Sequence, residues 1–170
     1  MSERQILEPW LRGTLGEVPP VFRAVLHALE LAKEDIERWC EGLTDEQLNA
    51  RPAGIAPLAF HVRHIARSID RLLTYAESRK LDSQQIAALK TELDAGAKRS
   101  ELFDEFAQAL DDAASRIRAL IPARLDEARK VGKRELPTTV GGLLVHLADH
   151  TQRHVGQAVT TAKIVVAQNS

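Results

Sequence analysis

Cysteine, aromatic residues, excess charge and long apolar runs are all scarce in this sequence of 170 residues. Cys40 is the only cysteine, which excludes a disulfide framework and fits a reducing compartment. The 23 basic and 24 acidic residues are spread along the chain, so they offer no charged patch for nucleic acid. No run of 18 apolar residues and no apolar leader is present. We therefore expect a soluble, cytoplasmic protein without nucleic-acid or membrane partners.

Apolar residues make up 44% of the chain, which is enough to build a core of useful size. The length is too small for two ordinary domains, so we predict one helical domain over residues 1–170. Residues 1–18 are predicted to form an N-terminal extension of this domain, because the helical pattern begins only after Pro19 and Pro20.

Four long segments have apolar residues at intervals of three and four, the period of an amphipathic helix. The predicted helices run from Pro20 to Gly42, from Leu58 to Ser78, from Ser100 to just before Pro122, and from Pro137 to about Ala167. Shorter helices are predicted at Thr44, where Gln47 completes a capping box, and between Ser83 and Leu93. Strands have little support, because no alternating run is bracketed by hairpin turns. The prediction is an all-α four-helix bundle with short additional helices in the connections.

Five of the six histidines fall in two short windows, His61 and His64 in one and His146, His150 and His154 in the other. Residues four apart share a helix face, so His150 and His154 can direct two ring nitrogens to one point. On a helical wheel His154 lies within the apolar arc and His150 at its margin. His61 lies closer to the apolar centre of its own helix than His64, so periodicity alone favours His61 as a third ligand.

Two interpretations of these histidines are open. A single inward histidine is usually a core residue whose ring meets a carbonyl group or a buried water. Several converging neutral imidazoles would be costly in a core, whereas one divalent cation satisfies all of them. Three neutral histidines suit Zn, Ni, Fe(II) or Cu and leave coordination positions open. Open positions distinguish a catalytic metal site from a structural one.

Residues 57–72 and 139–157 resemble the DinB/YfiT superfamily in the order and spacing of their motifs. The resemblance implies a four-helix bundle in which one divalent metal, most commonly Zn, Ni or Fe, is held by three histidines. In that family one ligand comes from the second helix, about seven residues after a Ser or Thr that begins it. Pro57 stands at that starting position, so the implied triad is His64, His150 and His154. Where relatives often have two adjacent histidines, this chain has Arg153 and then His154.

The resemblance also implies a metal-dependent enzyme, either a hydrolase or a transferase that uses a low-molecular-weight thiol. We expect a small-molecule substrate, a thiol cosubstrate in the second case, and a homodimer. No general base stands beside the triad in the sequence, and His61 and His146 are the best candidates, alternatively as residues that support the ligands. Gln157 follows His154 by about one turn and is predicted to contact a ligand or to be a surface amide. The alternative function is a non-catalytic bundle that stores a metal or binds a partner protein.

Overall fold

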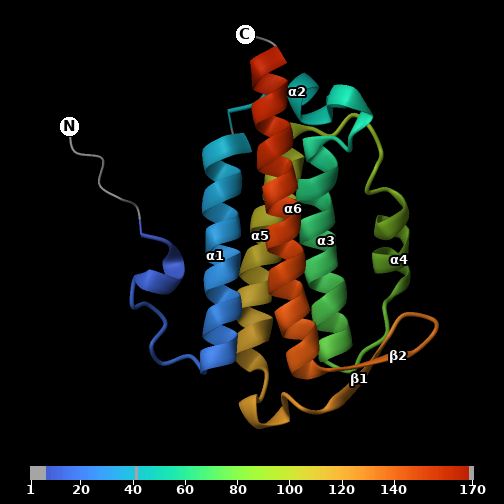
Figure 1. Ribbon diagram of the computed structural model, residues 1–170. Helices are drawn as coiled ribbons and strands as arrows, with labels where there is room; N and C mark the ends of the chain where they lie inside the picture. Colours follow the sequence, from blue (N-terminus) through green and yellow to red (C-terminus); the bar gives the residue numbers. More distant parts are fainter. Residues whose placement is uncertain (1–6, 41, 169–170) are drawn as a thin grey trace.

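Four long helices lie side by side in the computed structural model, which describes residues 7–40 and 42–168 (Figure 1). The helix α6 packs between α1 and α3, and α5 lies against α3 and α1. The predicted all-α four-helix bundle is therefore confirmed. Residues 1–6 of the predicted N-terminal extension lie outside the described residues. The bounds of the four helices are α1 Pro20–Cys40, α3 Leu58–Ala76, α5 Arg99–Ala119 and α6 Val140–Gln168.

The core of the bundle consists of the apolar stripes that the helical period predicted. The largest side chains with almost no exposure come from all four long helices, among them Phe22, Ile36, Ile65, Ile117 and Leu144. Burial of an apolar side chain of this size contributes about 1.5–3 kcal/mol to folding. Across residues 7–40 and 42–168, no helix has both the length and the apolar character needed to cross a membrane.

Short helices occupy the connections, as predicted. The helix α2 (Asp45–Asn49) begins with the expected capping box between Thr44 and Gln47. The cap of α4 (Ser83–Lys90) is Asp82, whose carboxylate accepts a hydrogen bond from the Gln85 amide at 2.8 Å. The long helix predicted from Ser100 begins one residue earlier, at Arg99. Short 3₁₀ turns, each with a proline at its start, lie at Pro9–Leu11, Pro52–Gly54 and Pro122–Arg124.

A small β-hairpin precedes α6, and the sequence analysis missed it. The strands β1 (Ala128–Val131) and β2 (Leu136–Thr139) are antiparallel, with Ala128 opposite Thr139. Neither strand has a buried residue, so the apolar alternation that marks a half-buried strand is absent. The predicted start of the last helix at Pro137 is therefore wrong. The helix α6 begins at Val140, and the hydroxyl of the preceding Thr139 accepts a hydrogen bond from the Gly142 amide.

The glycine pair at the start of α6 allows the chain to approach itself closely. The Gly141 amide donates to the Leu125 carbonyl at 2.8 Å, and a Cβ atom on Gly141 would lie 3.3 Å from that oxygen. The absence of a side chain at Gly141 therefore permits this close backbone contact. Gly156 has open space around its missing side chain, so close packing does not explain it.

Candidate metal centre

Three half-buried histidines from two adjacent helices lie together in the bundle. His64 comes from α3, and His150 and His154 come from consecutive turns of α6. The three rings can each offer one nitrogen so that all three nitrogens lie within 4.8 Å of one another. The ring centroids are 4.4 Å apart for His64 and His154, 4.6 Å for His150 and His154, and 4.9 Å for His64 and His150. The four-residue spacing on α6 brings His150 and His154 together, and the packing of α3 against α6 adds His64 to this group.

The closest approach in this cluster joins the Nε2 atoms of His64 and His150, which lie 3.2 Å apart. Two imidazole nitrogens bound at about 2.0–2.1 Å to one tetrahedral zinc ion would be about 3.3–3.4 Å apart. The separation of this one pair is therefore close to that of two nitrogens on a shared zinc ion, whereas the limit for all three nitrogens is 4.8 Å. The hydroxyl of Ser68, one turn along α3, also lies 3.2 Å from Nε2 of His64.

Glu92 is part of this arrangement, and the sequence analysis did not identify it. Its Oε2 atom lies 2.6 Å from Nδ1 of His64, and its Oε1 atom accepts a hydrogen bond from Arg71 at 2.7 Å. Burial raises the pKa of Glu92, but the hydrogen bonds from His64 and Arg71 outweigh it, so the pKa lies below its usual value. An ionised carboxylate accepts a hydrogen bond, so Nδ1 of His64 is the donor in this contact. No local pattern marks Glu92, which is 28 residues from His64 along the chain.

His61 contacts the cluster from its buried side. It is 6% exposed, and its Nδ1 atom lies 3.1 Å from Nδ1 of His154. This contact occupies one nitrogen of His154 and leaves its Nε2 atom available. The three-nitrogen group comprises His64 rather than His61, which agrees with the family motif and not with the helical wheel. The helical wheel favours His61, the most buried histidine of α3, because it considers only the apolar face of one helix, whereas the three-nitrogen group depends on how α3 packs on α6.

The other predicted pocket residues lie nearer to solvent. His146 is exposed, and its ring centroid is 5.4 Å from that of His150. Gln157 is also exposed, one turn beyond His154. Phe60 packs against three of the rings, stacked on His64 at 5.2 Å and edge-on to His61 and His154. The cluster therefore has an aromatic side and a solvent-facing side.

The clustered imidazoles favour their neutral forms. Burial, followed by repulsion from neighbouring rings, lowers the pKa of His61 and of His150 to about 4. Burial also lowers the pKa of His154 to about 4, with further contributions from His64 and Arg153. Neutral imidazoles are the form that binds a metal ion, so near pH 7 no proton must first be removed from these rings.

One ring nitrogen in the cluster lacks a partner within the described part of the chain. The Nδ1 atom of His150 is buried and makes no hydrogen bond to the protein. A buried polar atom without a partner costs about 1–3 kcal/mol, so such atoms are rare unless a site has another role. The three converging rings offer the donor set of a divalent transition metal, which binds imidazole readily.

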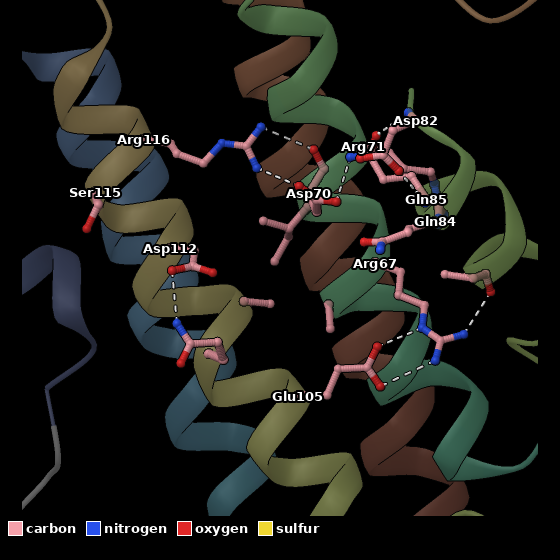
Figure 2. A pocket seen from close by; sticks show the side chains of 15 residues that line it. Arg67, Asp70, Arg71, Asp82, Gln84, Gln85, Glu105, Asp112, Ser115 and Arg116 are labelled. Atoms are coloured by element: carbon pink, nitrogen blue, oxygen red, sulfur yellow. Dashed lines mark hydrogen bonds and ion pairs between the residues drawn. The ribbon is translucent and has the colours of Figure 1, made fainter. Parts of the chain in front are cut away.

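A separate cavity of about 520 Å³ lies between α3, α4 and α5 (Figure 2). The described residues that line it include no histidine. Two ion pairs join α3 to α5 across it, Arg67 with Glu105 at 2.7 Å and Arg116 with Asp70 at 2.6 Å. Arg71 also lines this cavity and contacts Glu92, so it connects the cavity wall to the histidine cluster.

The lowered pKa values predict that the metal-free protein loses stability in mild acid. An unfolded histidine takes up a proton near pH 6.5, whereas His61, His150 and His154 resist protonation in the folded state down to about pH 4. The unfolded state therefore binds more protons between these values, and the free energy of unfolding should fall as the pH drops from about 6.5 to about 4. Denaturant unfolding at several pH values measures this slope. In His61→Leu, the free energy of unfolding should change less steeply with pH above pH 5, because one of the three groups is removed. An unchanged pH dependence would contradict the lowered pKa of His61.

Comparison with known proteins identifies the family of this chain and a solved structure of similar fold. A family model, that of the DinB superfamily, matches residues 28–158, which is most of the chain. A crystal structure described as a conserved protein from Enterococcus faecalis is similar in fold, with a TM-score of 0.72 and 20% sequence identity. The match covers 88% of this chain and 99% of that one. No curated protein matches the chain.

Proposed function

Because the chain belongs to the DinB superfamily, we propose that it binds one divalent transition metal through His64, His150 and His154. The observation that carries this proposal is the convergence of the three ring nitrogens within 4.8 Å, with two of them 3.2 Å apart. Neutral imidazole ligands select zinc, nickel or iron(II) over the hard cations calcium and magnesium. Two of the three ligand rings are also supported by a second contact, His64 by Glu92 and His154 by His61.

We further propose that the centre is catalytic, as a hydrolase or a transferase that uses a low-molecular-weight thiol. Among the described residues the ligand group contains three members, so protein side chains do not complete a four-coordinate shell. A metal held by neutral ligands supplies Lewis acidity toward a water molecule or a thiol at its open position. The substrate is a small molecule that approaches from the solvent-facing side of the rings.

The chain's own residues have separate tasks in this proposal. Phe60 covers one side of the rings and keeps bulk water from it. His146 is exposed and lies one turn before His150, so it can accept a proton from a water or thiol that enters. Gln157 offers an amide one turn after His154 and can orient a substrate polar group. His61 is buried and engaged with His154, so its task is to hold that ring in place.

Cobalt substitution tests the open centre directly. Protein loaded with one equivalent of Co(II) should show visible absorption bands that shift when 2-mercaptoethanol or imidazole is added, because either can enter an open position. Addition of glycerol at the same concentration serves as a control that changes the solvent but offers no strong ligand. A spectrum that is insensitive to thiol and imidazole would favour the alternative, a closed metal-storing or partner-binding bundle.

A further inference from the structure

The connection between α3 and α5 is anchored by an acidic residue. Within residues 77–96, all of which the structure describes, Glu92 is the only buried one, with 5% exposure. The apolar side chains of α4 point outward, since Ile86 and Leu89 are 43% and 48% exposed. Residues buried in a protein are usually apolar, whereas burial of a carboxylate costs free energy unless it has charged or hydrogen-bonding partners. This segment, residues 77–96, is called the α4 arm below.

Polar contacts from α3 hold the α4 arm in place on the outside of the bundle (Figure 1). Three arginines, one turn apart on α3, reach across to it, namely Arg63, Arg67 and Arg71. The first two donate mainly to backbone carbonyl groups near the end of α4, at distances from 2.7 to 3.3 Å. Arg71 donates to the Glu92 carboxylate. Segments with few buried apolar contacts open more readily than a core, so the arm belongs to the less stable part of the molecule.

The Glu92 carboxylate connects this arm to the histidine cluster. One of its oxygens accepts from Arg71, and the other accepts from Nδ1 of His64 at 2.6 Å. That second bond selects the His64 tautomer with its proton on Nδ1 and a lone pair on Nε2, the nitrogen 3.2 Å from His150. Without Glu92, both tautomers of His64 would be populated and its ring could rotate.

We propose that Glu92 is a positioning residue for the metal centre and that it couples docking of the α4 arm to metal occupancy. This inference rests on the proposed metal-binding function. A metal ion on Nε2 polarises the imidazole, which strengthens the Nδ1–H bond to the carboxylate. Binding is reciprocal, so whatever strengthens docking of the arm also strengthens metal binding by the same factor. The arm that forms one wall of the cavity in Figure 2 thereby responds to the metal.

Zinc affinity of matched variants tests the positioning role. Glu92→Gln keeps the size of the side chain but removes the charge, and loss of such a supporting contact typically weakens metal binding 10–100-fold. Glu105→Gln is the control, because Glu105 also pairs with an α3 arginine next to the arm but touches no ligand histidine. We expect its zinc affinity to stay within about twofold of the wild type. Equal affinities for all three proteins, or equal losses in both variants, would overturn the inference.

Hydrogen exchange tests the coupling to the arm. Zinc should increase amide protection of residues 83–93 in the wild type and in Glu105→Gln, and this increase should be absent in Glu92→Gln.

If Glu92→Gln does not fold, nitrogen-15 spectra of the metal-free wild type test the positioning role instead, because His64 should show its proton on Nδ1. A proton on Nε2 would overturn the inference. A wild type that binds no zinc refutes the proposed function and the inference with it, whereas zinc binding that Glu92→Gln leaves unchanged overturns the inference alone.

Discussion

Replacement of either α6 histidine, His150→Ala or His154→Ala, should lower metal affinity by more than about 100-fold. Loss of a contact that only supports a ligand already costs 10–100-fold, and loss of one of three ligands removes more. Metal analysis of the purified variants and competition with a zinc indicator measure this effect. His27→Ala is the matched control, because His27 is also a buried histidine but lies on α1, where its ring contacts Thr14. Metal content like that of the wild type in both α6 variants would contradict the site.

The same assay distinguishes the two histidines of α3. His64→Ala should remove most of the metal, because His64 supplies the third nitrogen of the cluster. His61→Ala should weaken binding only moderately, since His61 contacts the ring of His154 rather than the convergent nitrogens. If His61→Ala empties the centre and His64→Ala does not, the assignment based on the family motif is wrong by one turn of helix.

Removal of the metal should abolish activity and leave the bundle folded. The core contains large apolar side chains from all four long helices, so we expect it to remain folded without a cation. Small zinc-dependent domains behave differently, because metal binding supplies most of their folding free energy. Treatment with a chelator should therefore preserve the helical circular dichroism signal and a cooperative thermal transition. The transition temperature should rise when zinc is restored, since free metal at 100 times the dissociation constant adds about 2.7 kcal/mol.

A control for this experiment is readdition of the metal to the stripped protein, which should restore both activity and the higher transition temperature. Unfolding on chelation would instead indicate a structural metal, and the catalytic proposal would then be withdrawn.

Helix periodicity and the two short histidine motifs predicted the fold and the histidine pair of α6, because each pattern involves residues that are close in the sequence. The apolar residues of α3 and α6 repeat every three or four positions, and that period alone specifies which face of each helix is buried. The spacing of His150 and His154 likewise predicts that they share a face, because one helical turn joins them. The resemblance to the DinB superfamily, which the family match confirms, rested on these same segments.

The hairpin β1–β2 shows where local patterns are insufficient. Each strand has only four residues, and their side chains are exposed or half-buried. The sequence therefore lacks the alternation of apolar and polar residues that identifies a longer, half-buried strand. Its place is determined by contacts with α3 and α6, among them the hydrogen bond from Arg129 to the Ala76 carbonyl at 2.7 Å. Contacts between residues more than 50 positions apart have no signature in a short window.

By itself, the sequence determined the helical fold class, the helix order and the pair of histidines on the last helix, because each depends on spacing along one element. The spacing of α3 alone left His61 and His64 open, and the family resemblance implied His64. The tertiary structure groups His64 with that pair, and it alone brought Glu92 from a distant connection onto His64. The wheel placed His61 at the apolar centre, but the ligand position depends on how α3 is rotated against α6. That rotation results from packing of the whole core, which no single helix encodes.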